Sequence, residues 1–263
     1  MKKIIDKIYL FLIFAFLYAP IFVLIVFSFN NSKLKGSWAG FTLKWYKNLF
    51  NDPAILSSLW TTIIVAVVAT LVSTIVGTLA AIAINELKGV SKTAILNINY
   101  LPVINPDIVT AVALMGFFGL INLKMGYTTM IISHIVFCIP YVILSILPKL
   151  SQLQKNTVEA ALDLGATPFY ALRYVVIPQI KPAILTGALM AFTLSIDDFA
   201  ISFFNTGQGV SNLSITIYSM ARKGINPSIN AISTIMLVVL LILLLIINKR
   251  SEKQNTNKKI NEV

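Results

Sequence analysis

Long apolar runs alternate with short polar segments along most of the chain, and this pattern predicts membrane-spanning helices. Several of the runs exceed the roughly 20 residues that a helix needs to cross the hydrocarbon core of a bilayer. We place the predicted spans at residues 8–29, 57–84, 93–120, 127–147, 183–204 and 229–247. The expected fold class is therefore an all-α integral membrane protein with six transmembrane helices.

The composition supports this class and excludes others. Of the 263 residues, 57% are hydrophobic and only 12% are charged, and a soluble core could not absorb so much apolar surface. The net charge of +11 reflects loops, because no soluble basic domain is present to bind nucleic acid. The single cysteine, Cys138, excludes a disulfide framework. We expect no catalytic set, metal site or cofactor in this chain, and we interpret the one histidine, His134, as a hydrogen-bonded packing residue.

The distribution of basic residues predicts the orientation in the membrane. Six spans place both termini on one side, and most of the 21 basic residues fall in cytoplasmic segments when that side is inside the cell. We therefore predict a cytoplasmic N-terminus at residues 1–7, a transmembrane domain at 8–248 and a cytoplasmic polar tail at 249–263. A polar loop at 148–182 also lies in the cytoplasm in this arrangement.

The polar loop carries local signals for two short helices joined by a sharp turn. Good helix formers precede Gly165, which stands where the end of a helix favours a left-handed residue. Thr167 and Pro168 then fit the N-cap and the first residue of a second helix. We expect this second helix to end before Pro178. These signals alone also fit an amphipathic hairpin that lies on the membrane surface without a partner.

The spacing of residues in this loop resembles the signature of ABC-importer permeases. The matching residues are Glu159, Ala160, Ala161, Gly165, Val175, Ile177 and Pro178. In that family the first short helix, the coupling helix, docks on the ATP-hydrolysing subunit. The resemblance implies that Glu159 offers a charge to that subunit, that Ala160 and Ala161 permit close approach, and that Gly165 makes the turn.

Further segments are similar to the spermidine/putrescine type of these permeases. They are residues 40–46, 106–109, 192–199 and 217–220. The resemblance implies a bacterial cytoplasmic (inner) membrane protein that translocates polyamines, with both termini cytoplasmic. It also implies a sister permease subunit, ATP-binding subunits that hold ATP and magnesium, and an extracellular or periplasmic substrate-binding protein.

Three acidic residues, Asp107, Asp197 and Asp198, lie inside predicted spans. A carboxylate at the centre of a membrane helix costs about 2.5–3.5 kcal/mol, so each needs a reason. Counted from the cytoplasmic ends of their spans, Asp107 and Asp197 reach one level, roughly 21 Å into the core. Two carboxylates at one depth suggest a cation site. Because neighbouring helical residues diverge by about 100°, we expect one of Asp197 and Asp198 to line the pathway and the other to contact a neighbouring helix or lie near an outer gate.

The resemblance places five residues on polyamine-handling positions of the family, namely Trp45, Asp107, Ser195, Asp197 and Asp198. An aromatic face also suits an ammonium group, which gives Trp45 a physical rationale. Three alternatives remain open from the residues. The acids could be structural, the cargo could be ferric iron or another small cation, or the chain could be an ion-coupled secondary transporter. The last alternative leaves the loop around Glu159 unexplained.

Overall fold

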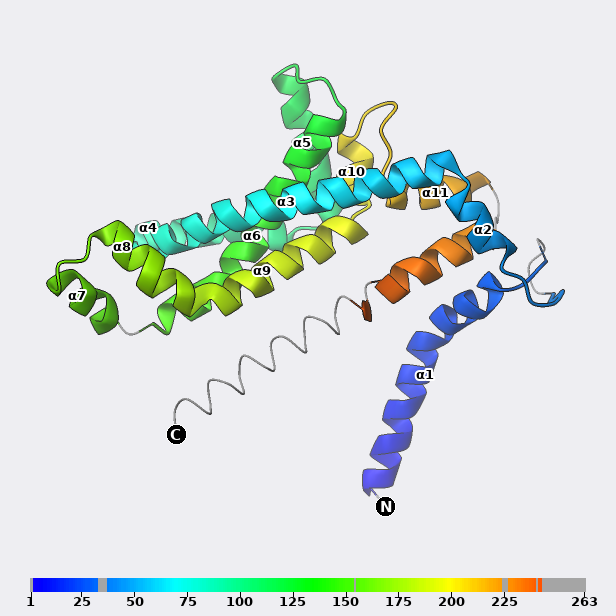
Figure 1. The fold of residues 1–263 in the computed structure, drawn as a ribbon, viewed down its shortest axis with the longest axis horizontal. Coiled ribbons are helices and arrows are strands. Elements are labelled where there is room, and N and C mark those ends of the chain that lie inside the picture. Colours follow the sequence, from blue (N-terminus) through cyan, green and yellow to red (C-terminus); the bar gives the residue numbers. More distant parts are fainter. Residues whose placement is uncertain (1, 33–36, 154, 224–226, 240, 243–263) are drawn as a thin grey trace. The chain divides into compact units, whose positions relative to one another are not determined.

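The computed structural model describes residues 2–32, 37–153, 155–223, 227–239 and 241–242 of the chain. These residues are almost entirely helical, and within them the only β-type pairing is an isolated bridge between Asn30 and Phe41 (Figure 1). The elements are α1 (Lys2–Ser28), α2 (Lys44–Phe50), α3 (Pro53–Glu86), α4 (Gly89–Ile104), α5 (Asp107–Leu120), α6 (Tyr127–Ser151), α7 (Lys155–Asp163), α8 (Pro168–Ala171), a π-helical turn (Leu172–Val176), α9 (Ile177–Asp197), α10 (Ala200–Asn205) and α11 (Leu213–Lys223). A further apolar helix covers Pro227–Val239.

The chain forms two compact units. The first comprises Met1–Ser57 together with Thr216–Val263, and the second comprises Ser58–Ile215. The second unit contains most of α3 and all of α4 to α10, and therefore both the polar loop and the three acids of the predicted spans.

Within the described residues, four helices are long and apolar enough to cross a membrane, and a bent pair of helices is a fifth candidate. The four are Asp6–Ser28, Pro53–Glu86, Tyr127–Ser151 and Pro168–Asp197. The chain is thus a multi-pass membrane protein of helical class. The sixth predicted span begins in the shorter helix Pro227–Val239, and most of its remainder lies outside the described residues, as does the polar tail at 249–263.

The third predicted span is two helices rather than one. The axes of α4 and α5 are bent by 108° at the break between them. Asn105 is extended there, with ψ 146°, because the following residue, Pro106, disfavours a helical conformation before it and lacks an N–H group. The helix α4 therefore ends at Ile104 and does not continue to Asp107. The depth predicted for Asp107 assumed one uninterrupted helix, and this assumption is wrong.

The fifth predicted span is also interrupted. We expected a helix to residue 204, but α9 ends at Asp197 and Asp198 is extended, with ψ 132°. The short helix α10 then begins at Ala200. Hydropathy does not mark this break, because apolar residues continue on both sides of it.

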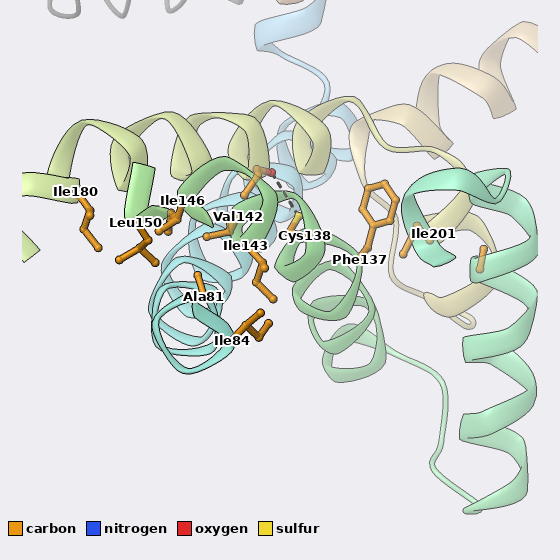
Figure 2. Packing of buried hydrophobic residues seen from close by; sticks show 12 residues of the cluster. Ala81, Ile84, Phe137, Cys138, Val142, Ile143, Ile146, Leu150, Ile180 and Ile201 are labelled. Carbon is orange, nitrogen blue, oxygen red and sulfur yellow. Dashed lines mark hydrogen bonds between the residues drawn. The ribbon is translucent and has the colours of Figure 1, made fainter. Parts of the chain in front are cut away.

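The core of the second unit lies where α3, α6 and α9 meet (Figure 2). Its buried residues include Ala81 and Ile84 of α3, Ile146 of α6 and Ile180 of α9. Figure 2 shows these side chains converging around α6. Such a core is expected of spans that bury one another rather than facing lipid on every side.

Two glycines let the neighbouring helices approach α6 closely. A Cβ at Gly77 of α3 would lie 2.7 Å from Cγ1 of Val142, and a Cβ at Gly187 of α9 would lie 3.3 Å from the Val142 Cα. Small residues at such crossings are typical of packed membrane helices. Val142 itself is fully buried.

We expect Gly77→Ala to destabilise the second unit. The new methyl group would overlap the stiff side chain of Val142, and overpacking costs about 1–3 kcal/mol, more than the roughly 1 kcal/mol that alanine gains in helix propensity. The measurement is thermal stability in detergent, followed by size-exclusion chromatography after heating. Gly116→Ala is the matched control, because a Cβ at Gly116 meets nothing within 4 Å. Equal stability of the two variants would contradict the prediction.

Candidate functional site

The polar loop folds as a helical hairpin whose turn is centred on Gly165. Gly165 has φ 86°. Its N–H donates to the carbonyl of Leu162 at 2.9 Å, and the N–H of Ala166 donates to the carbonyl of Ala161 at 3.0 Å. These two bonds are the Schellman arrangement that ends a helix with a left-handed residue. The predicted left-handed conformation of Gly165 is confirmed.

The start of the second short helix also follows the prediction, but its end does not. The Thr167 hydroxyl oxygen accepts a hydrogen bond from the N–H of Tyr170 at 3.3 Å, and Pro168 is the first helical residue. The expected stop before Pro178 is wrong, because the chain continues through the π-helical turn into α9. In that turn the N–H of Ile177 donates to Leu172, and Pro178 then falls in the first turn of α9, where an N–H is not required.

The hairpin presents small and apolar residues to its surroundings. Glu159 and Ala160 are exposed, and Ala161 is half-buried. A hollow of about 460 Å³ is lined by Ala161, Leu164, Gly165, Ala166, Thr167 and Tyr170. Leu164 is 90% exposed, although burying such a side chain would be favourable. The hairpin therefore exposes an apolar side chain beside an open hollow.

Two of the three acids of the predicted spans, Asp107 and Asp197, lie next to helix interruptions and are exposed. Asp107 is the first residue of α5, directly after the bend, where the positive end of the helix dipole favours a carboxylate. Asp197 is the last residue of α9, directly before the second interruption. Broken helices of this kind expose backbone and side-chain polar groups at membrane depth, which is tolerated only inside protein or along a cavity.

Asp198 has different surroundings, because its carboxylate is buried and caps α10. Its Oδ1 accepts from the N–H of Ile201 at 3.0 Å. Its Oδ2 accepts from the N–H of Ser202 at 2.7 Å and from the Ser202 hydroxyl at 2.8 Å. The residue is 8% exposed. The Asp198 carboxylate thus satisfies donors that the start of a helix would otherwise leave without partners.

A buried polar network surrounds this cap. Nδ1 of His134 on α6 lies 2.8 Å from the hydroxyl of Ser195 on α9, and Nε2 lies 2.9 Å from the hydroxyl of Ser202 on α10. Nε2 is also 3.5 Å from Oδ2 of Asp198. The side-chain amide of Asn212 donates to the Ser202 hydroxyl at 2.7 Å and to the Asp198 carbonyl at 3.4 Å. The interpretation of His134 as a hydrogen-bonded packing residue is confirmed.

The directions of these hydrogen bonds follow from the chemistry of the groups. The single hydroxyl proton of Ser202 is donated to Asp198, so the Ser202 oxygen can only accept from His134 and Asn212. Nε2 of His134 therefore carries a ring proton, and in the neutral imidazole Nδ1 accepts from the Ser195 hydroxyl. Every polar atom of the imidazole is satisfied in this arrangement.

Trp45 lies in the first unit, on α2, and is 4% exposed. Its indole N–H donates to the carbonyl of Asn30 at 2.7 Å. The ammonium group of Lys44 lies 5.8 Å from the centre of its ring, a distance suited to a cation–π contact. The indole thus anchors α2 to the segment after α1, and a role in handling substrate stays a prediction.

Two members of the network, Ser202 and Asn212, were not predicted from the sequence. Ser202 lies in the first turn of α10, which Asp198 precedes by two residues, and an acid just before a helix is a capping signal that was available. Asn212 precedes α11 and accepts from the N–H of Ile215 at 2.9 Å, so it caps that helix. Its contact with Ser202, ten residues earlier, crosses the loop between α10 and α11 and has no local signal. Among the described residues, no three His, Cys, Asp or Glu side chains gather as metal ligands would.

Comparisons with known proteins agree with this architecture. The family model for the binding-protein-dependent transport system inner membrane component matches residues 73–256. The spermidine/putrescine transport system permease protein PotC of Escherichia coli K12 is 36% identical over 226 residues, which are 86% of each chain. The putrescine transport system permease protein PotI of the same organism is 36% identical over 233 residues, covering 85% of this chain and 82% of that one.

A solved structure has the same fold at lower sequence identity. It is a bacterial ABC transporter involved in the import of the acidic polysaccharide alginate, and one of its chains matches with a TM-score of 0.72 and 20% identity. The match covers 96% of this chain and 94% of the other. At this level of identity the likeness supports the fold alone.

Proposed function

The chain belongs to the family of binding-protein-dependent transport system inner membrane components, and from this premise we propose that it is the permease subunit of an ABC importer for polyamines. Its homology to the polyamine permeases PotC and PotI, at 36% identity over most of the chain, supports spermidine and putrescine as the cargo. ATP hydrolysis in partner subunits drives the transport, and this chain supplies part of the path through the membrane.

The observation that carries the proposal is the pair of exposed carboxylates, Asp107 and Asp197, at two interrupted helices of a membrane protein. An ionisable residue within a membrane span is costly, and its default interpretation is a pathway for ions or substrate. A polyamine consists of ammonium groups separated by short apolar chains. Carboxylates set among apolar side chains are complementary to both of these parts.

The surroundings of the remaining residues suggest a division of roles. Asp107 and Asp197 are exposed and contact the cation, whereas Ser195 and Asp198 are buried and hold the interrupted helix in place. This division follows the expectation that only one of the adjacent acids lines the pathway. It assigns the pathway to Asp197 and the structural contact to Asp198.

The hairpin around Gly165 is the element that receives the motion of the ATPase. In this proposal α7 is the coupling helix, with Glu159, Ala160 and Ala161 at its contact with the partner. ATP and magnesium bind to that partner and not to this chain. The path is completed by a sixth span and a sister permease, a substrate-binding protein delivers the cargo from outside, and both termini are cytoplasmic.

Reconstitution tests the proposal directly. The chain would be purified with its ATP-binding subunits and sister permease, and placed in proteoliposomes with the binding protein. We expect spermidine or putrescine to stimulate ATP hydrolysis and labelled polyamine to accumulate only when ATP is supplied. Uptake that needs no ATP and stops when the proton gradient is collapsed would contradict it. Stimulation by ferric iron and not by polyamines would refute the choice of cargo.

A further inference from the structure

We propose that His134 is a positioning residue of the transport site, which fixes the direction of the Asp197 carboxylate without touching the cargo. This inference rests on the proposed function, in which Asp197 contacts the transported cation. It is carried by the network that joins α6 to both sides of the interruption between α9 and α10.

The first step concerns the rotation of α9 about its own axis. Ser195 is 1% exposed, and its hydroxyl is bound to Nδ1 of His134. Successive helical residues are separated by about 100°, so Asp197, two residues later, points roughly 200° away from Ser195. Holding Ser195 against α6 therefore turns Asp197 to the opposite face, where it is exposed.

The second step concerns the end of α9. The same imidazole donates from Nε2 to Ser202, whose hydroxyl and N–H in turn hold the carboxylate of Asp198. Asp198 is thereby kept out of α9, with ψ 132°, and the helix ends at Asp197. One histidine thus sets both the face on which Asp197 lies and the point at which its helix ends.

The third step is that His134 has no capacity left for the cargo. It is fully buried, and both ring nitrogens are engaged with protein hydroxyls. A cation would have to displace Ser195 or Ser202 to reach it. His134 acts on transport through the position of Asp197.

Chemical labelling at position 197 tests the inference independently of transport. The complete transporter would carry Asp197→Cys in a Cys138→Ser background and be treated with a membrane-impermeant, positively charged methanethiosulfonate. We expect His134→Leu to slow labelling about five-fold, as the loss of the network's hydrogen bonds implies. The matched control is Ser145→Ala, which removes another α6–α9 bond, at 3.2 Å to the carbonyl of Ala183, away from the interruption. We expect it to leave the labelling rate unchanged.

The outcomes separate a failure of this inference from a failure of the proposed function. An unchanged labelling rate in His134→Leu, or an equal change in Ser145→Ala, would overturn the positioning role. If His134→Leu does not reach the membrane, Ser195→Ala decides, because it removes only the Nδ1 contact. A labelling rate that is the same with Ser195→Ala as without it would overturn the inference. Polyamine uptake is also measured with Asp197 intact. The inference is supported if uptake falls in His134→Leu and recovers in part in His134→Gln, because glutamine keeps a donor for Ser202.

Discussion

Gly165→Val is expected to reduce ATP-driven uptake about ten-fold or more while leaving the acidic site intact. The left-handed conformation at Gly165, with φ 86°, costs an L-residue about 1–2 kcal/mol, and a β-branched residue is a genuine outlier there. To relieve this strain, the hairpin would give up the hydrogen bonds from Gly165 and Ala166 that end α7. The measurements are polyamine uptake in proteoliposomes and the amount of ATPase subunit that co-purifies.

The control for this prediction separates backbone strain from crowding. A Cβ at Gly165 would meet nothing within 4 Å, so a clash of the Cβ does not account for a loss. Asparagine tolerates the left-handed conformation far better than valine does, and we therefore expect Gly165→Asn to retain most of the coupling. If the asparagine and valine variants lose ATPase co-purification and uptake to the same degree, the turn conformation is not what couples the subunits.

The local features of the polar loop could be predicted because neighbouring residues decide them. The turn at Gly165 and the cap at Thr167 are set by residues within one helical turn, and both were found as expected. The continuation past Pro178 was missed because it depends on a π-helical turn that shifts the hydrogen bonds before the proline. A proline in the sequence shows that a helical hydrogen bond will be missing, but it does not show how the helix adjusts to this loss.

The positions of the spans were predicted better than the interruptions within the spans. Hydropathy locates a membrane segment by its average, and the average does not change at Asp198, where α9 ends. Pro106 is a local signal for a break in the third span, but it does not give the angle of 108° between α4 and α5. Asp107 and Asp197 cannot be placed at one level by equal rise, because α5 does not continue the axis of α4.

Which of the two adjacent acids is buried could not be derived from their spacing. The expected divergence of Asp197 and Asp198 assumed one continuous helix, whereas α9 ends at Asp197 and Asp198 is extended; the two side chains nevertheless differ in exposure. Which of them is buried depends on His134 and Asn212, which come from other parts of the chain. A lone histidine in a span gave no sign of holding an interrupted helix, because its partners, Ser195 and Ser202, are ordinary hydroxyl residues on α9 and α10.

The adjacent acids should respond differently when each is changed to its amide. Asp197 is exposed, so Asp197→Asn should fold and assemble normally and lose only its charge. A hydrogen bond to a charged group contributes about 1.5–3 kcal/mol, which predicts a fall of about ten-fold or more in the uptake rate at saturating spermidine. Asp107→Asn should behave in the same way, since Asp107 is also exposed.

Asp198→Asn should instead weaken the protein itself. One oxygen of Asp198 accepts from both the N–H and the hydroxyl of Ser202. An amide NH₂ group in place of that oxygen is itself a donor and would leave these two donors without an acceptor. Leaving buried donors without acceptors costs about 1–3 kcal/mol, so we expect a lower thermal stability in detergent as well as lower uptake. Glu86→Gln is the control for the loss of one exposed carboxylate. If Asp198→Asn is as stable as Glu86→Gln and still loses uptake, Asp198 contacts the cargo and the division of roles between the two acids is reversed.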